Sequence, residues 1–325
     1  MAPLLEISNL SVRFHSDKAE VFAVNGLDLS LDTGKAIAIV GESGSGKSTV
    51  MMAVMRLLQS NASITGQVKL DGTDVLQLPE KAMRRLRGKE MAMVFQNAGS
   101  SMNPTKTIGD QMIEPMLFHH MASARDARQV AVKLLHQVGI PDPEERLNNY
   151  PFEFSGGQLQ RVMIAMALIA DPKLLIADEP TTALDVTVQA EVLILLKKLQ
   201  RERGMGLVFV THDLAVAAQV ADDIYVMYGG FVMERIAASE LTTHLVHPYL
   251  RGLVQSIPKI DGPRTELPYI PGQPISITGG LPDGCVFASR CDKRFVKCHE
   301  RPRHISISQQ HSVSCWLAEG GVEQA

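Results

Sequence analysis

Three features are scarce in this sequence of 325 residues: long apolar runs, an excess of charge of one sign, and cysteine outside the C-terminal end. The longest apolar runs, such as residues 163–170 and 174–177, are far shorter than the roughly 18 residues that span a bilayer, so we expect no membrane-spanning segment. The N-terminus lacks the basic region and apolar core of a secretory signal. We therefore expect the chain in the cytoplasm.

Neither sign of charge dominates. There are 32 Lys and Arg residues and 35 Asp and Glu residues, which leaves a net charge of −3 and no general electrostatic attraction for nucleic acid or anionic lipid. The one basic stretch, residues 84–89, is typical of a solvated helix end. With 45% hydrophobic and 21% charged residues, the composition is that of a packed globular protein with one large or two medium domains.

Cysteine is absent from the first 284 residues, and all four cysteines lie in the last 41. This clustering indicates a shared purpose, and in a reducing cytosol clustered thiols favour metal ligation over disulfides. No pair has the C-x-x-C spacing common in structural zinc sites, whereas an iron–sulfur cluster accepts wider spacing. Between residues 284 and 304 there are six Lys or Arg residues and two acids, which would offset the charge of four thiolates. An iron–sulfur cluster, a zinc ion and free thiols remain open.

The hydrophobic pattern predicts an α/β fold. Residues 4–14 and 21–31 alternate apolar and polar side chains, as half-buried antiparallel strands do, so we expect a small flanking sheet. Residues 36–40 form an apolar strand that enters a glycine-rich loop, and residues 48–58 after it have the pattern of a helix. From about residue 105 to residue 170 the periodicity is helical, which predicts a helical subdomain.

Strands and helices alternate further along, which predicts a mostly parallel sheet. The expected elements are strands 174–177, 207–210 and 224–227 and helices 188–201 and 214–221. After about residue 256, prolines and glycines are frequent and no long periodic segment occurs. We expect one domain over residues 1–245, with its helical subdomain, and a loop-rich C-terminal extension over residues 246–325.

A phosphate-loop pattern, G-x-x-x-x-G-K-[ST], matches residues 41–48. Its glycines let backbone NH groups turn toward a phosphate, and the N-terminus of the following helix adds its positive end. Lys47 would reach the β and γ oxygens of ATP, and Ser48 would bind magnesium. The expected strand before the loop and helix after it are the context that this chemistry requires.

An apolar strand that ends in two carboxylates lies downstream, at residues 174–179. Such a strand brings charge to the rim of a parallel sheet, beside bound phosphates. Asp178 would hold magnesium, and Glu179 would accept a proton from the water that attacks the γ-phosphate.

Between these motifs, some twenty residues before the acidic strand, lies Phe154-Ser155-Gly156-Gly157-Gln158. This order of motifs resembles the ATP-binding cassette (ABC) family, and the resemblance covers residues 4–240. It implies an α/β P-loop ATPase core with an antiparallel β subdomain and a helical subdomain, which binds ATP and Mg²⁺.

The resemblance also implies roles for other residues. Gln96 matches a glutamine that contacts magnesium and lies in the loop touching the membrane partner. Asp185 matches a residue of the loop that crosses to the opposite subunit. His212 matches a histidine that contacts the γ-phosphate. Phe14, or alternatively Phe22, matches the aromatic that stacks on adenine. The ATP-binding residues expected are Phe14, Gly41, Ser43, Gly44, Ser45, Gly46, Lys47, Ser48, Thr49, Gln96, Ser155, Gly157, Gln158, Asp178 and Asp185. Magnesium would contact Ser48, Gln96 and Asp178, and catalysis would use Glu179, His212 and Gln96.

His247-Pro248-Tyr249 and Leu281-Pro282-Asp283-Gly284-Cys285 resemble the C-terminal extension of peptide-importer ABC ATPases, the type that includes the D subunits of dipeptide permeases. The resemblance implies a 4Fe-4S cluster on the four cysteines, with zinc as the alternative. The cysteines are Cys285, Cys291, Cys298 and Cys315.

The implied function is ATP hydrolysis that drives import of di- or oligopeptides, with nickel chelates, opines or sugars as alternative cargoes. The implied partners are a second, related ATP-binding subunit in a heterodimer, two membrane-spanning permease subunits, and a periplasmic or extracellular substrate-binding protein. The chain would then be a peripheral protein on the cytoplasmic face of the inner membrane. An ABC ATPase acting on nucleic acid is a less favoured alternative, because the sequence has neither a second cassette nor an inserted coiled coil.

Overall fold

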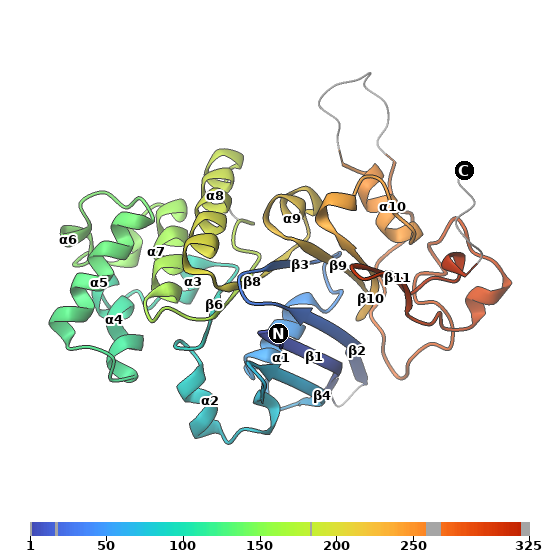
Figure 1. Ribbon diagram of the computed structural model, residues 1–325, viewed down its shortest axis with the longest axis horizontal. Helices are drawn as coiled ribbons and strands as arrows, with labels where there is room; N and C mark the ends of the chain where they lie inside the picture. Colours follow the sequence, from blue (N-terminus) through green and yellow to red (C-terminus); the bar gives the residue numbers. More distant parts are fainter. Residues whose placement is uncertain (1, 17–18, 183, 258–267, 320–325) are drawn as a thin grey trace. The chain divides into compact units, whose positions relative to one another are not determined.

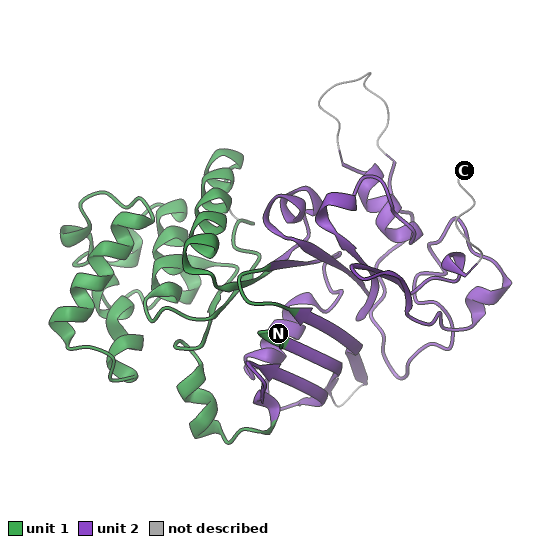
Figure 2. Ribbon diagram, in the orientation of Figure 1, with its two compact units in different colours: residues 1–5, 31–35, 77–209 green, residues 6–30, 36–76, 210–325 purple. Residues whose placement is uncertain are grey.

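A computed structural model describes residues 2–16, 19–182, 184–257 and 268–319 (Figure 1). Residues 258–267 and 320–325 of the predicted extension lie outside the described residues. The chain forms two compact units, drawn in green and purple in Figure 2: unit 1 comprises residues 1–5, 31–35 and 77–209, and unit 2 comprises residues 6–30, 36–76 and 210–325. Within the described ranges, no helix is both long and apolar enough to cross a membrane.

Unit 2 contains most of a four-stranded sheet in the order β2-β1-β4-β5. The strands are β1 (Leu5–His15), β2 (Glu20–Leu31), β4 (Ala62–Leu70) and β5 (Thr73–Asp74). The apolar side chains of β1, among them Ile7, Leu10 and Val12, are buried, in an alternation that shifts by one residue between Ile7 and Leu10. The flanking sheet is thereby confirmed, and β4 and β5, which pair antiparallel, are additions that the sequence analysis did not predict.

A second set of strands in unit 2 follows the order β11-β12-β10-β9-β3. They are β3 (Ala36–Val40), β9 (Asp223–Tyr228), β10 (Phe231–Ala237), β11 (Ile305–Ser308) and β12 (His311–Val313). β3 and β9 are parallel, and the remaining pairs are antiparallel. The helices of this unit are α1 (Lys47–Val54), α9 (Leu214–Val220) and α10 (Pro248–Gln255). The proline-rich extension thus adds two strands to a sheet, which its sequence did not predict.

Unit 1 carries strands in the order β8-β7-β6 and most of the longer helices. Its strands are β6 (Met91–Val94), β7 (Leu174–Asp178) and β8 (Gly206–Thr211), the last of which ends in unit 2. Its helices are α2 (Glu80–Leu86), α3 (Ala98–Ser101), α4 (Ile108–Phe118), α5 (Ala124–Gln137), α6 (Pro143–Arg146), α7 (Gly156–Leu168) and α8 (Val186–Arg203). The run from α4 to α7 confirms the helical character predicted for residues 105–170.

Glu234, a fully buried carboxylate on β10, fastens the extension to the sheet. Its oxygens accept hydrogen bonds from the backbone NH groups of Val246 (3.1 Å) and His247 (2.7 Å). One oxygen also lies 2.7 Å from Nε2 of His311 on β12. A carboxylate removed from water is stable only with such partners, so these contacts fix where the extension leaves the core.

His247 is buried beside this carboxylate and caps α10. Its Nδ1 accepts a hydrogen bond from the backbone NH of Tyr249 at 3.0 Å, which requires a neutral ring with the proton on Nε2. Burial lowers the pKa of His247 to about 3, because the imidazolium form would lose its hydration.

Replacing Glu234 by alanine should destabilise the protein strongly. The substitution leaves two buried backbone NH groups and the His311 ring without their acceptor, which we expect to lower the free energy of unfolding by about 3 kcal/mol. Urea unfolding at pH 7 measures this difference. The control is Glu300→Ala, at an exposed position of the same extension, which should cost less than about 0.5 kcal/mol. Equal losses for the two variants would show that Glu234 is no anchor.

His247 should make the protein sensitive to mild acid. Between about pH 6.5 and pH 3 the unfolded chain binds a proton at His247 that the folded chain excludes, so stability falls as the pH falls. His247→Asn keeps a capping oxygen and does not titrate. The stability lost between pH 7 and pH 4 should therefore be smaller in this variant, by about 3 kcal/mol. Urea unfolding at both pH values, with His299→Asn at an exposed position as control, tests this; parallel losses in all three proteins would contradict it.

Candidate functional site

The glycine-rich loop between β3 and α1 packs backbone against backbone. A Cβ atom at Gly41 would lie 2.2 Å from the carbonyl oxygen of Met227, and one at Gly46 would lie 2.3 Å from that of Ala23. Gly46 also has φ +98°, a conformation that L-residues rarely adopt. Only glycine fits at these two positions, so the pattern recognised in the sequence follows from the path of the loop.

Lys47 is buried and folded back over this loop, with 5% of its surface exposed. Its Nζ donates hydrogen bonds to the carbonyl oxygens of Gly41, at 2.8 Å, and Glu42, at 3.0 Å. These carbonyls hold the ammonium group against the loop backbone. The loop therefore carries a fixed positive charge at its centre, which suits a phosphate.

Two further observations fit a phosphate ligand. α1 begins at Lys47, and its N-cap, Gly46, provides no side-chain hydrogen bond in the described structure. The hydroxyl of Ser45 is buried and, among the described residues, has no hydrogen-bond partner. An uncapped helix N-terminus and an unsatisfied hydroxyl beside a lysine together suit an anion. Of the other predicted loop residues, Ser43 and Ser48 are exposed and Thr49 is half-buried.

Unit 1 brings together two of the predicted catalytic residues. β6 and β7 are parallel with Val94 opposite Ala177, so the residues that follow both strands meet at one edge. Nε2 of Gln96 donates a hydrogen bond to Oε2 of Glu179 at 3.0 Å, and Oγ1 of Thr182 donates to the same oxygen at 2.9 Å. The sequence analysis did not assign a role to Thr182.

Glu179 has φ +45°, in the left-handed region that residues other than glycine seldom occupy. Its neighbour Asp178 ends β7 and is buried, with 8% of its surface exposed. Backbone strain of this kind persists where the surrounding structure fixes it, and it is often found at functional sites. The strand end therefore holds one buried and one half-buried carboxylate side by side in sequence.

The Ser-Gly-Gly-Gln segment forms the N-terminus of α7. Oγ of Ser155 accepts a hydrogen bond from the NH of Gln158 at 3.3 Å, and Oε1 of Gln158 accepts one from the NH of Ser155 at 3.1 Å, which is a capping box. A Cβ atom at Gly157 would lie 2.6 Å from Cγ1 of Val188, so α7 and α8 approach closely there. Gly156 is exposed and has open space around its Cα.

Two further predicted residues, His212 and Asp185, belong to different units. His212 is exposed just after β8, in unit 2. Asp185, in unit 1, caps α8 by accepting hydrogen bonds from the backbone NH groups of Thr187 (3.1 Å) and Val188 (3.0 Å), a structural role that the sequence analysis missed.

Phe14 and Phe22, the two candidates for stacking on adenine, differ in burial. Phe14 is half-buried on β1, whereas Phe22 is 8% exposed and packs in the core of unit 2. The guanidinium carbon of Arg13 lies 4.8 Å from the centre of the Phe22 ring. The Phe14 ring is thus the more accessible of the two.

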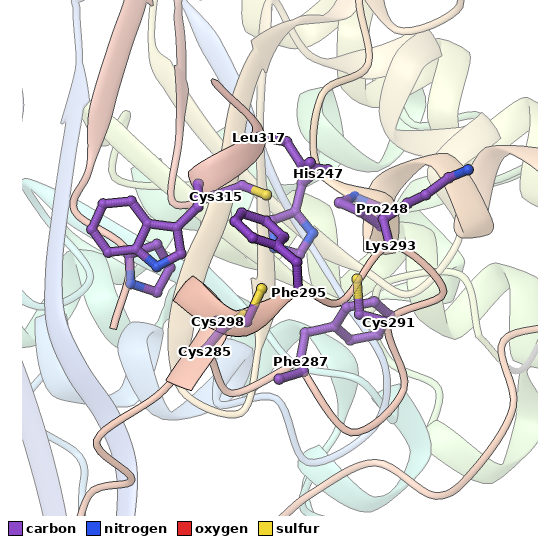
Figure 3. Close-up of a pocket in the computed structure, with 13 residues that line it drawn as sticks. His247, Pro248, Cys285, Phe287, Cys291, Lys293, Phe295, Cys298, Cys315 and Leu317 are labelled. Atoms are coloured by element: carbon purple, nitrogen blue, oxygen red, sulfur yellow. The ribbon is translucent and has the colours of Figure 1, made fainter. Parts of the chain in front are cut away.

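The predicted 4Fe-4S cluster is wrong, and so is its zinc alternative. The four cysteines line one pocket with His247 and Phe287 (Figure 3). Nevertheless, in the part of the chain that the structure describes, no group of three or more His, Cys, Asp or Glu side chains is arranged to hold a metal ion. The cysteines are free thiols.

The surroundings of the cysteines explain this correction. Burial raises the pKa of Cys285, and it raises the pKa of Cys291 to about 11 and that of Cys315 to about 12. Metal ligation requires thiolates, whereas these surroundings favour the neutral thiol. The basic residues nearby, counted in the sequence as compensating charge, do not reverse the effect of burial.

Two residues of the C-terminal part also touch the glycine loop. Oη of Tyr249 accepts a hydrogen bond from the NH of Glu42, and the guanidinium of Arg290 pairs with the Glu42 carboxylate. The sequence analysis counted Arg290 only as part of the basic composition of the extension.

Comparisons with known proteins agree with an ATP-binding cassette followed by a C-terminal extension. The ABC transporter family matches residues 24–182, and the C-terminal region of oligopeptide/dipeptide transporters matches residues 233–298. The oligopeptide transport ATP-binding protein OppD of Haemophilus influenzae is 42% identical, over 98% of both chains. The dipeptide transport ATP-binding protein DppD of Bacillus subtilis is 44% identical, over 100% of this chain and 98% of the relative.

A solved structure matches the cassette as well. A dimeric ATP-binding cassette in a post-hydrolysis state, bound to ADP and Pi, is 29% identical with a TM-score of 0.65, over 72% of this chain and 98% of that chain. Its fold agrees with the α/β cassette and flanking antiparallel sheet described above. By its sequence relatives and its fold, this chain belongs to the ABC transporter family of ATP-binding proteins.

Proposed function

We propose that this chain is the ATP-hydrolysing subunit of an importer of di- or oligopeptides. The observation that carries the proposal is the phosphate loop with buried Lys47, on a chain that aligns over nearly its whole length with peptide transport ATP-binding proteins. The match of residues 233–298 to the C-terminal region of oligopeptide/dipeptide transporters supports a peptide cargo rather than a nickel chelate, an opine or a sugar.

The phosphate loop and α1 would bind the phosphates of ATP. Lys47 would neutralise the β- and γ-phosphates, the hydroxyl of Ser45 would gain the partner that the described residues do not supply, and the N-terminus of α1 would add its dipole. Ser43, Gly44 and Thr49 would complete the cradle. The partial exposure of Phe14 supports it, rather than Phe22, as the residue that stacks on adenine.

Hydrolysis would use the two carboxylates at the end of β7, Asp178 and Glu179. Bound magnesium neutralises phosphate charge, and Ser48, Asp178 and Gln96 would be its contacts. Glu179 would act as the general base, and its hydrogen bonds from Gln96 and Thr182 would orient its carboxylate toward the attacking water. His212 would contact the γ-phosphate.

The signature segment would serve an ATP molecule held by another subunit. The exposed N-terminus of α7 at Ser155, with an open Gly156 behind it, is an anion-binding arrangement, which Gly157 and Gln158 would complete. Asp185 would lie in the loop that crosses to that subunit. We infer a heterodimer with a second, related ATP-binding subunit, in which two ATP molecules are bound between the subunits.

The other partners follow from the cargo. Two membrane-spanning permease subunits would form the path, with Gln96 in the loop that touches them, and a periplasmic or extracellular binding protein would deliver the peptide. The chain would then act as a peripheral protein on the cytoplasmic face of the inner membrane. This assignment involves no nucleic acid.

Replacing Glu179 by glutamine should leave ATP binding intact and lower the rate of hydrolysis at least about 100-fold, because the amide cannot accept the proton of the attacking water. Steady-state release of phosphate by the transporter assembled with its partner subunits measures hydrolysis, and equilibrium binding of ATP by the full chain measures affinity. Glu202→Gln, on the exposed side of α8, is the matched control and should hydrolyse ATP at the wild-type rate. Near wild-type turnover in Glu179→Gln would place the base elsewhere.

Peptide uptake tests the cargo. Cells that lack this gene should lose uptake of labelled di- and oligopeptides, the intact gene should restore it, and the gene with Glu179→Gln should not, because binding without hydrolysis cannot complete the cycle. Uptake of a labelled sugar, an opine and a nickel chelate is measured in the same strains. Loss of one of these with normal peptide uptake would replace the peptide assignment.

A further inference from the structure

Glu42, the second residue of the glycine loop, is held at three of its groups: the backbone NH, the backbone carbonyl and the side-chain carboxylate. Its NH donates a hydrogen bond to Oη of Tyr249 at 3.1 Å, and its carbonyl oxygen accepts one from Nζ of Lys47 at 3.0 Å. Its carboxylate pairs with Arg290, which lies 248 residues further along the chain. The phosphate loop is thus tied both to its own lysine and to two residues of the C-terminal part of unit 2.

The ion pair between Arg290 and Glu42 is bidentate. Nη1 of Arg290 lies 2.6 Å from Oε2 of Glu42, and Nη2 lies 3.1 Å from Oε1. The Arg290 side chain is 5% exposed and the Glu42 side chain is 24% exposed. This geometry fixes the orientation of the carboxylate as well as its charge, because the planar guanidinium donates two parallel hydrogen bonds.

Arg290 is itself held in place from several sides. Its Nε donates a hydrogen bond to the carbonyl oxygen of Pro271 at 2.7 Å, and Nη2 donates to that of Ile270 at 3.3 Å. The guanidinium carbon lies 5.5 Å from the centre of the Tyr228 ring and 6.0 Å from that of Phe287. Little side-chain freedom is left, so Arg290 presents a rigid fork to the loop.

The aromatic rings behind the arginine connect it to the second contact with the loop. Tyr228, Tyr249 and Phe287 pack with ring centres 5.0 to 5.2 Å apart. Tyr249 belongs to α10, Phe287 to the extension, and Tyr228 to the end of β9, next to the carbonyl of Met227 that lies against Gly41. One packed cluster therefore contacts the loop both at the side chain of Glu42 and at the loop backbone.

We propose that Arg290 is a positioning residue for the phosphate loop, so that the C-terminal extension sets the affinity of this chain for the phosphates of ATP. Arg290 orients Glu42, and the Glu42 carbonyl in turn helps to hold the Lys47 ammonium over the loop. The inference rests on the proposed function, because it assigns the ligand of the loop as ATP. A loop already held in its binding shape loses less conformational entropy when the phosphate binds.

A purely structural role for the pair would have a different consequence. If the Arg290–Glu42 pair served only to attach the extension, breaking it would lower the free energy of unfolding and leave the nucleotide affinity of the folded protein unchanged. Nucleotide affinity of protein shown to be folded is therefore the deciding measurement.

The test uses the full chain, Mg²⁺ and a nonhydrolysable ATP analogue, with binding measured by titration calorimetry at a temperature where circular dichroism shows each variant folded. Arg290→Ala should bind about tenfold more weakly than wild type, or weaker still. Arg290→Lys keeps the charge but cannot donate two parallel hydrogen bonds, so the affinity of this variant for the analogue should be intermediate. Arg294→Ala removes an exposed arginine of the same extension and should bind like wild type.

A double variant shows whether the two residues act as one device. Glu42→Ala combined with Arg290→Ala should bind no more weakly than the weaker single variant, because each substitution removes the same interaction. If Arg290→Ala does not fold, Glu42→Gln replaces it, since this variant keeps the size of the side chain and leaves the bonds of Arg290 to Pro271 and Ile270 in place.

The outcomes separate this inference from the proposed function. Wild-type protein that does not bind the analogue would overturn the proposed function. Wild-type protein that binds, together with an Arg290→Ala variant of equal affinity, would overturn the positioning role alone. Losses in the two single variants that add up in the double variant would also overturn it.

Discussion

The close approach of the glycine loop to two strands fixes the geometry of the proposed phosphate site. At Gly41 and Gly46 the backbone lies so near the carbonyls of Met227 and Ala23 that no side chain fits. The loop is therefore held between the end of β9 and the first part of β2, both in unit 2. In that path the carbonyls of Gly41 and Glu42 converge on Lys47, which is why its ammonium is buried rather than solvated. The anion site follows from backbone packing, and the lysine supplies only its charge.

Much of the fold could be predicted from the sequence, because the hydrophobic periodicity of each element and the order of the motifs can be read from neighbouring residues. The alternation of strands and helices after residue 173 was confirmed to within two residues at each boundary. The proximity of Gln96 and Glu179 follows from two parallel strands whose ends meet. By contrast, β11 and β12 are short, and the side chains of β11 are mostly exposed, so they leave no alternating pattern. The pairing of Glu42 with Arg290 crosses 248 residues and has no local signature at all.

The cysteines show where a sequence argument fails for a physical reason. Their clustering was real, and the structure does gather them around one pocket. Spacing along the chain, however, carries no information on the direction of each side chain or on the solvation that decides its protonation. Burial raises the pKa of Cys285, Cys291 and Cys315 and so favours the neutral thiols, and among the described residues no group of side chains is arranged to hold a metal ion.

On the proposed function, the N-termini of α1 and α7 both bind phosphate, and they differ in what surrounds them. The loop before α1 is supported by the extension of the same unit, through Tyr249 and Arg290. Within the part of the chain that the structure describes, the N-terminus of α7 is capped by its own Ser155 and Gln158, and Ser155 and Gly156 are exposed. On the proposed function, the first site has its affinity for ATP set within this chain, whereas the second is useful only when another subunit brings a phosphate to it. Changes in the extension should then alter the affinity of the phosphate loop for ATP. Changes in the partner subunit should instead alter the rate of hydrolysis, because the N-terminus of α7 contacts a phosphate only when the partner brings one.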